Sequence, residues 1–294
     1  MSVKIGVIGV PGGWSSEILA DTIERLTGFR LLVDLGQVEL DFNQQKVWFE
    51  GFDLTQLDAL IIKKAAPFYS PNILDRLEVL SYLESLGVQM FSSPNKIIRM
   101  VDRLSCTVRL QQAGIPMPPT TITEDLRVAK KVIQKYGEAI LKPLYTSKAR
   151  GMTLIKATDN LEEQLKEYQK NNQIFYIQQK IDLSGKDLGV VFLGGEYLAT
   201  YARCKTNAQA WNTTTVSGGK YQNYEPSQEI IELAKKAQKP FGLDFTCVDV
   251  AVTKTGLYVF EVSAFGGFRG LLEGCGLDMA KLYTEYVLKR LSHG

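Results

Sequence analysis

The chain has 294 residues, of which 45% are hydrophobic and 22% are charged, a composition typical of a globular protein with two or three modest domains. Its net charge of +2 lacks the basic excess of most nucleic-acid-binding proteins, and no apolar run approaches the ~18 residues of a membrane span. The single histidine is His293, which excludes a histidine base for a serine or cysteine nucleophile and a histidine-based metal site.

The cysteines and the first residues indicate the compartment. Four cysteines are scattered along the chain without a C-x-x-C pair, which favours reduced thiols in the cytoplasm. The first ten residues are typical of a strand that enters a glycine turn, and they lack the charged start and cleavage site of a signal peptide. We therefore expect a cytoplasmic protein with no membrane partner and no nucleic-acid partner.

Residues 1–93 alternate between apolar strands and capped helices, which predicts an α/β domain with a mostly parallel sheet. A hairpin is expected around residues 38–50. The next segment predicts one long helix, with Ser93 as its N-cap, Pro94 as its first residue and Gly114 as its stop. The proline-rich segment 115–120 then predicts a stiff, extended linker near a domain boundary.

Beyond the linker the pattern changes to antiparallel strand pairs with few helices, which is typical of an α+β arrangement. Two hairpins stand out, one turning at Gly194 and Gly195 and one at residues 253–256. A C-terminal helix is expected to start near Leu277, after a glycine-rich loop that reads A-F-G-G-F-R-G. We predict domains at residues 1–93, 94–182 and 183–294.

The last hairpin carries two carboxylates in apolar strands. If its strands pair across the turn, Asp249 and Glu261 are nearly opposite and can share a face. Two adjacent carboxylates repel unless a cation lies between them, and Mg²⁺ with substrate phosphate would satisfy both. The alternative is that one carboxylate points to solvent and the other meets a lysine.

Lys142 lies in a strand that is otherwise apolar, so its side chain either extends from a sheet edge into water or reaches an anion. The loop after it contains Ser147, Lys148 and Arg150, residue types that can fold over phosphates, although most such turns are simply solvated. Asp187 after a strand exit, and Arg203 and Asn212 around a polar loop, are weaker candidates for nucleotide and phosphate contacts. Their alternatives are an ordinary strand exit and a mobile surface loop.

In their order and spacing, these segments resemble the ATP-grasp superfamily and, within it, the RimK-like α-L-glutamate ligases. The resemblance covers nearly the whole chain and is clearest over residues 92–275. The matching segments include S-P-N-K-I-I-R-M-V-D-R-L, A-I-L-K-P-L, Y-I-Q-Q-K-I, G-K-D-L-G-V-V-F-L-G-G-E and V-F-E-V-S-A. It implies an α/β N-terminal domain followed by an α+β ATP-grasp fold, in which two subdomains clamp ATP.

The resemblance also implies roles for individual residues and a homodimer or homotetramer. The residues implied to bind ATP are Arg103, Lys142, Lys148, Gln179, Lys180 and Asp187. The residues implied to hold Mg²⁺ are Asp249, Glu261 and Ser263. Arg203 and Asn212 would reach the γ-phosphate, and Arg269 would bind a substrate carboxylate, unless Arg269 pairs instead with Glu273 one helical turn away.

Several positions depart from the family pattern. Ser263 stands where the family has an asparagine in the metal strand, Gln179 where a glutamate is common and Gly189 where an arginine is common. Arg103 stands where the family often has a lysine, and A-F-G-G-F-R-G, which contains Arg269, stands where the family usually has an S-P-G-L loop. The serine questions the metal geometry, and the other changes point to an altered acceptor site.

The activity implied is an ATP- and Mg²⁺-dependent ligase. It would activate a small-molecule or peptide carboxylate as an acyl phosphate, which an amine then attacks to give an amide, ADP and phosphate. Neutralisation of phosphoryl charge by Mg²⁺, lysine and arginine agrees with this chemistry, since no protein nucleophile is needed. Two alternatives stay open: a degenerate ATP-grasp module that acts as a regulator or scaffold, and a small-molecule kinase on the same fold.

Overall fold

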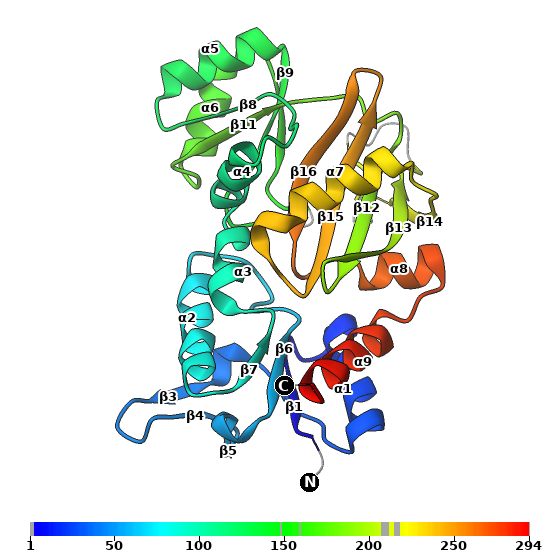
Figure 1. Ribbon diagram of the computed structural model, residues 1–294. Coiled ribbons are helices and arrows are strands. Elements are labelled where there is room, and N and C mark those ends of the chain that lie inside the picture. The colour runs from blue at the N-terminus through cyan, green and yellow to red at the C-terminus, as the bar shows by residue number, and fades with distance from the viewer. Residues whose placement is uncertain (1–2, 148, 159, 207–211, 215–217, 294) are drawn as a thin grey trace.

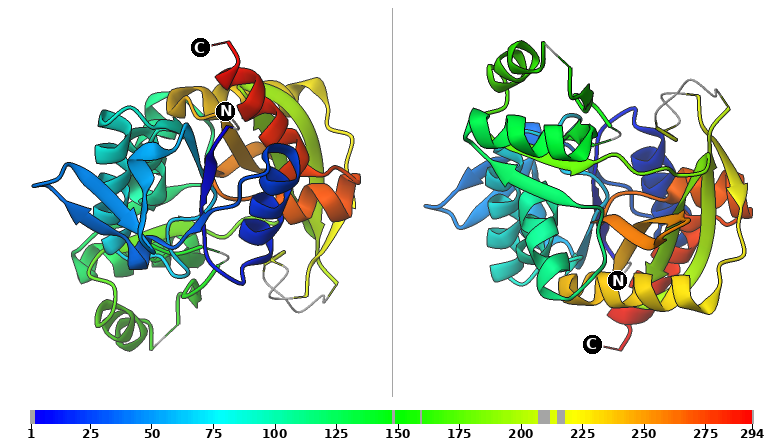
Figure 2. Two further views of the ribbon diagram at one scale, coloured as in Figure 1. Left: turned by 90° about the horizontal axis from the view of Figure 1, so that it is seen from below. Right: turned by 90° about the horizontal axis from the view of Figure 1, so that it is seen from above.

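The computed structural model describes residues 3–147, 149–158, 160–206, 212–214 and 218–293. The described residues form three parts, each built on a main sheet, and the first part carries a small three-stranded sheet as well (Figure 1). An N-terminal part lies at one end, a five-stranded sheet lies in the middle, and a four-stranded sheet with two helices lies at the other end (Figures 1 and 2).

The N-terminal part is a parallel four-stranded sheet in the order β2-β1-β6-β7, which confirms the α/β prediction. Every residue of β1 is buried, as expected for a strand covered on both faces. The strands are β1 (Ile5–Ile8), β2 (Leu32–Val33), β6 (Ala59–Ile62) and β7 (Gln89–Phe91). The helices are α1 (Trp14–Thr27) and α2 (Asn72–Ser85). The predicted hairpin is present as β3 (Glu39–Asp41) and β4 (Lys46–Phe49), with β5 (Phe52–Asp53) beside β4.

The helix predicted from Ser93 to Gly114 is two helices, α3 (Pro94–Val101) and α4 (Arg103–Gln112). Asp102 separates them, because its backbone is extended and its carboxylate accepts from the amides of Leu104 and Ser105 at 3.1 and 3.2 Å. The hydroxyl of Ser93 does not cap α3 and donates to Glu84 instead. The prediction of a single helix was therefore wrong, and the break places Arg103 at the start of α4.

The second sheet has the order β10-β9-β11-β8 and is antiparallel. Its strands are β8 (Thr120–Thr123), β9 (Glu138–Leu141), β10 (Thr153–Lys156) and β11 (Phe175–Gln179). Two helices, α5 (Leu126–Tyr136) and α6 (Leu161–Gln169), pack together against this sheet and share a separate core with it. Strand β8 and helix α5 had no counterpart among the predicted elements.

The third sheet has five antiparallel strands in the order β14-β13-β12-β15-β16. They are β12 (Lys186–Leu193), β13 (Glu196–Cys204), β14 (Lys220–Asn223), β15 (Phe245–Thr253) and β16 (Gly256–Ser263). Both predicted hairpins are confirmed, and Gly194 and Gly195 turn the first with φ of 61° and 83°. Helix α7 (Gln228–Gln238) packs on β15 and β16. Short 3-10 helices lie between larger elements: η1 (Leu35–Gln37), η2 (Leu54–Gln56) and η4 (Lys239–Phe241).

Helix α8 (Phe268–Cys275) follows β16 and is succeeded by α9 (Met279–Leu291). A loop was predicted over residues 264–270, and this was wrong from Phe268 onward. Glycines let α8 approach β13, since a Cβ built on Gly270 would lie 2.5 Å from the Tyr201 ring. Helix α9 returns to pack on α1, and one buried cluster joins Ile5 and Val7 to Phe245 (Figure 1). The N-terminal part is thus fixed against the third sheet.

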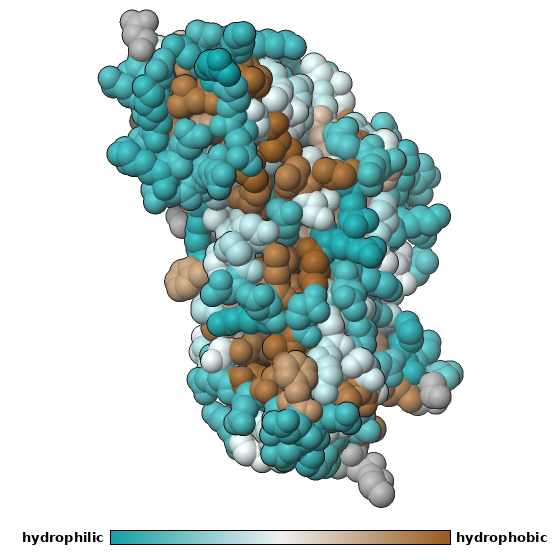
Figure 3. All heavy atoms as spheres, turned by 90° about the vertical axis from the view of Figure 1, so that its left-hand side faces the viewer, coloured by the Kyte–Doolittle hydropathy of each residue, from teal (hydrophilic) through white to brown (hydrophobic). Residues whose placement is uncertain are grey.

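Within the described ranges, no helix has the length and apolarity needed to cross a bilayer. The face that carries α2 and the β3–β4 hairpin shows apolar side chains in patches among hydrophilic ones (Figure 3).

The domain limits predicted at 93/94 and 182/183 fall between β7 and α3 and between β11 and β12. Because α3 also packs on α2, these limits stay a prediction.

Candidate active site

The two carboxylates of the last hairpin face each other. Asp249 on β15 is in register with Glu261 on β16, and a bulge between Asp249 and Val250 creates this pairing. Because Val250 pairs with Val259, the extra residue Phe260 has no partner in this register, and Glu261 moves opposite Asp249. The expectation that the two residues are near-opposite is confirmed.

Each carboxylate is paired with an arginine from a different part of the chain. The guanidinium of Arg103 donates to Glu261 at 2.9 Å, and the guanidinium of Arg203 lies 2.9 Å from Asp249. The alternative of one solvated carboxylate and one lysine pair was therefore wrong. Both carboxylates thus have an arginine as counter-charge before any ligand binds. These ion pairs offset the desolvation cost of placing the carboxylates in apolar strands.

Asp249 lies in an environment that disfavours its charge. Burial raises the pKa of its carboxyl, Arg203 opposes this shift and Glu261 adds to it, so that the pKa is about 7. In the described part of the chain, Asp249 and Glu261 do not belong to any group of three or more histidine, cysteine or acidic side chains. With the Ser263 hydroxyl on the same strand as Glu261, they offer hard oxygen donors of the kind Mg²⁺ prefers.

Ser263 is already engaged in the turn that follows its strand. Its hydroxyl oxygen accepts from the amide of Phe265 at 3.2 Å. The carbonyl of the same Phe265 accepts from Lys63 Nζ at 2.5 Å, so the N-terminal part holds this turn. The role of Ser263 as a metal ligand stays a prediction.

Lys142 follows β9 directly and is buried, so the alternative of an edge lysine in water was wrong. Its Nζ donates to Gln178 at 2.5 Å and lies 5.0 Å from the centre of the Phe260 ring. Burial, assisted by Arg103, lowers its pKa to about 7, while Glu261 and Asp249 oppose the shift. A buried cation with so low a pKa is suited to an incoming anion, because the anion restores its charge.

Arg203 and Asp187 form a second ion pair beside the first. Arg203 Nε lies 3.1 Å from Asp187, and the hydroxyl of Thr213 also donates to this carboxylate. Asn212 caps the neighbouring turn, where its Oδ1 accepts from the amide of Thr214 at 3.1 Å. Asp187 is thus occupied by protein donors, and its contact with a ribose stays a prediction.

The remaining nucleotide candidates lie at the end of β11. The amide of Gln179 donates to the Pro119 carbonyl at 2.8 Å, and Lys180 Nζ lies 2.8 Å from Glu138. These contacts place both residues where the second sheet leads into the third, as expected for a hinge. Lys148 lies outside the described residues.

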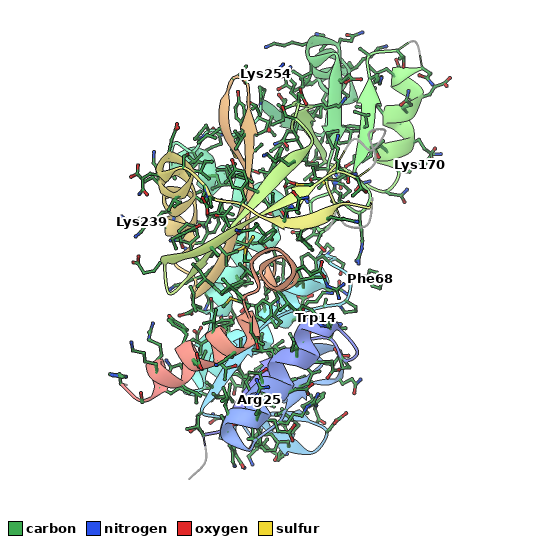
Figure 4. The ribbon with its side chains drawn as sticks, turned by 90° about the vertical axis from the view of Figure 1, so that its right-hand side faces the viewer. Trp14, Arg25, Phe68, Lys170, Lys239 and Lys254 are labelled. Atoms are coloured by element: carbon green, nitrogen blue, oxygen red, sulfur yellow. The ribbon has the colours of Figure 1, made fainter. Side chains whose placement is uncertain are left out.

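Arg269 is on the exposed side of α8, with its side chain 55% accessible. Its guanidinium lies 5.0 Å from the centre of the Trp14 ring, and its Nε lies 3.8 Å from Glu273. The alternative pairing with Glu273 is therefore present. Trp14 is the first residue of α1, at the end of this helix that faces the third sheet (Figure 4). A role for Arg269 in carboxylate binding stays a prediction.

Position 189, where the family often has an arginine, has no space for a side chain in this structure. Gly189 lies between Asp249 and Tyr201 in the register of the sheet, and a Cβ added to it would lie 2.3 Å from the Tyr201 ring. The Tyr201 hydroxyl lies 3.4 Å from Cys247 Sγ. The space that a side chain at 189 needs is thus filled by a buried tyrosine.

Sequence reasoning missed residues that complete the site. Gln178 was read only as part of a strand end, although alternation along β11 turns it inward toward Lys142. Thr213 had no sequence signal. A cavity of about 60 Å³ borders Arg103 and Glu261, and Tyr69 from the N-terminal part contributes to its wall. The N-terminal part therefore belongs to the site.

A match to a protein-family model identifies the family of this chain. The RimK-like ATP-grasp domain matches residues 100–287. The chain belongs to the RimK-like ATP-grasp family. This range contains both arginines, both carboxylates and Lys142, and the predictions of the family, the ATP-grasp fold and an ATP-dependent ligase are confirmed.

Individual relatives agree with this assignment. The chain is similar to the tetrahydromethanopterin:alpha-L-glutamate ligase of Methanosarcina acetivorans, with 23% identity over 97% of this chain and 98% of the relative. Among solved structures it resembles the ATP-grasp ligase PsnB, complexed with a variant of a minimal precursor, Mg and ADP, at a TM-score of 0.76 and 16% identity over 99% of each chain. It also resembles the D-cycloserine synthetase DcsG, at a TM-score of 0.71 and 14% identity over 98% of this chain and 99% of the other.

Proposed function

We propose that this RimK-like ATP-grasp ligase joins a small-molecule or peptide carboxylate to an amine, using ATP and Mg²⁺ and passing through an acyl phosphate. One observation carries the proposal: Asp249 and Glu261 are brought into register by a bulge, and each has its own arginine. Such a row of hard oxygen donors beside cations suits a nucleotide phosphate with its metal ion.

Each residue contributes binding or orientation rather than covalent chemistry. When bound, Mg²⁺ would neutralise phosphate charge and polarise the transferred group. Asp249 and Glu261 would hold it, with Ser263 or a water as a further ligand. Lys142 and Arg203 would contact phosphate oxygens, and Arg269 would orient a carboxylate. Exclusion of water by the loop after β9 would protect the acyl phosphate from hydrolysis.

Thermal unfolding with ADP, with and without Mg²⁺, tests the nucleotide–metal site. A ligand that binds the folded state raises the melting temperature by mass action. We expect a Mg²⁺-dependent rise in wild type that is lost in Glu261→Gln. This change removes the charge of a proposed cation ligand, and even a change to an outer-shell partner lowers metal affinity by about 10–100-fold. The matched control is Glu196→Gln, a solvent-exposed carboxylate of the same sheet, which should keep the rise. Absence of any rise in wild type would contradict the nucleotide site.

Product analysis then separates the three activities. ADP release that needs both a carboxylate and an amine, with an amide product, supports the ligase. A phosphorylated product that forms without an amine identifies a kinase. Tight binding of ADP and Mg²⁺ without turnover across a broad carboxylate and amine panel favours the regulator or scaffold.

A further inference from the structure

Arg103 connects three segments that are far apart in the sequence. It is the first residue of α4 and is buried, and one of its donors reaches Glu261, 158 residues away. The other hydrogen bonds that it donates go to the loop that follows β9, here called the phosphate loop and defined as residues 143–147. The side chain therefore lies between the proposed cation ligand and the base of the loop that would cover the phosphates.

The contacts with the phosphate loop form a set around one residue. Arg103 Nε donates to the carbonyl of Pro143 at 3.1 Å, and Nη2 donates to that of Thr146 at 3.2 Å. The backbone amide of Arg103 donates to the carbonyl of Leu144 at 3.2 Å. Three loop carbonyls are thus held by one residue, while Nη1 holds Glu261 at 2.9 Å.

A lysine at this position would not reproduce the arrangement. Its ammonium is a compact point charge, whereas the planar guanidinium presents donors in several fixed directions. A single lysine Nζ cannot reach the carbonyls of Pro143 and Thr146 along the directions that Nε and Nη2 use while also holding Glu261. The departure from the frequent lysine therefore has a structural consequence.

We propose that Arg103 is a positioning residue that latches the phosphate loop to Glu261 until a divalent cation binds. The inference rests on the proposed function, because it assigns the cation to Glu261. A cation on Glu261 competes with Nη1 for the carboxylate, so one anchor of the guanidinium is released and the loop loosens. By reciprocity, a change that loosens the loop also alters cation binding.

Hydrogen exchange of the loop amides of residues 144–147 tests the latch directly. In ligand-free protein we expect Arg103→Lys and Arg103→Met to speed this exchange by roughly tenfold, since hydrogen bonds from a charged donor are lost. In the wild-type ADP complex, addition of Mg²⁺ should speed exchange of these amides relative to ADP alone. This response to Mg²⁺ should be absent in both variants. The matched control is Arg76→Lys, because Arg76 also holds a backbone carbonyl, that of Ala65 at 3.0 Å; it should behave like wild type.

A second variant keeps the test independent of folding effects at Arg103. Glu261→Gln removes the charge that Nη1 holds, so ligand-free exchange at residues 144–147 should already be fast and Mg²⁺ should not change it. Equal exchange in wild type and both Arg103 variants, or an equal Mg²⁺ response in all of them, overturns the latch. Failure of wild type to bind ADP and Mg²⁺ at all overturns the proposed function as well, and calorimetry on the same samples identifies that case.

Discussion

Replacing the buried Lys142 by methionine should stabilise the ligand-free protein while removing nucleotide binding. A pKa lowered from 10.5 to about 7 corresponds to about 5 kcal/mol of unfavourable free energy when the lysine is charged. Methionine removes this cost and retains much of the apolar stem. It also leaves Gln178 Oε1 without the donor it now has, which costs about 1–3 kcal/mol. The net gain is about 2 kcal/mol or more.

The gain must depend on pH with a defined sign. The folded-state pKa of Lys142 lies below its unfolded-state value, so its destabilising effect is fully present below pH 7 and fades as the pH rises toward 10.5. Thermal unfolding at pH 6 should therefore show Lys142→Met melting roughly 4 to 8 °C above wild type. At pH 9.5 the difference should be much smaller.

The assay needs one control and one functional readout. Lys254→Met removes an exposed lysine at the tip of the β15–β16 hairpin (Figure 4) and should not change the melting temperature. The rise produced by ADP and Mg²⁺ should be absent in Lys142→Met. A variant that melts at or below wild type at pH 6, or a difference that stays constant to pH 9.5, would refute the reasoning about burial.

Two further substitutions probe the departures from the family pattern. Ser263→Asn should keep or strengthen the affinity for Mg²⁺, because an amide carbonyl is a better Mg²⁺ ligand than a hydroxyl. Calorimetry in the presence of ADP measures this affinity. A loss of activity with intact affinity would point to a substrate role for Ser263. Gly189→Ala should lower the free energy of unfolding in urea by about 1–3 kcal/mol through overlap with Tyr201. The double change Gly189→Ala with Tyr201→Leu should recover part of that loss, and strictly additive losses would contradict the overlap.

Local signals predicted most of the fold. Apolar runs and glycine turns marked the parallel sheet and both hairpins correctly. Helix α8 was not predicted, because Gly270 and Gly274 lower helix propensity. Its stability depends on packing against Tyr201, which is distant in sequence. The break at Asp102 was missed because the surrounding apolar residues keep a helical period. The side chain of Asp102 caps a new helix at this point, so the first helix ends although the apolar period continues.

The site was predictable only where chemistry is local. Counting back from the turn at residues 253–256 places Asp249 opposite Phe260, and the bulge at Asp249 is what brings Glu261 into register. The arginine partners were beyond reach of any spacing argument, since Arg103 and Glu261 are separated by 158 residues. The resemblance named both arginines as nucleotide contacts, but their pairing with the carboxylates is a property of the folded chain.

That pairing accounts for the partly buried carboxylates Asp249 and Glu261 without a ligand. Among the described side chains at the centre of the site, Lys142, Arg103 and Arg203 balance Asp187, Asp249 and Glu261. A cation added alone would leave excess positive charge, and a nucleotide added alone would leave excess negative charge, both in a poorly solvated place. The ions therefore favour each other's binding. Because burial is the main cause of the low pKa of Lys142, a phosphate bound beside this lysine would restore its charge.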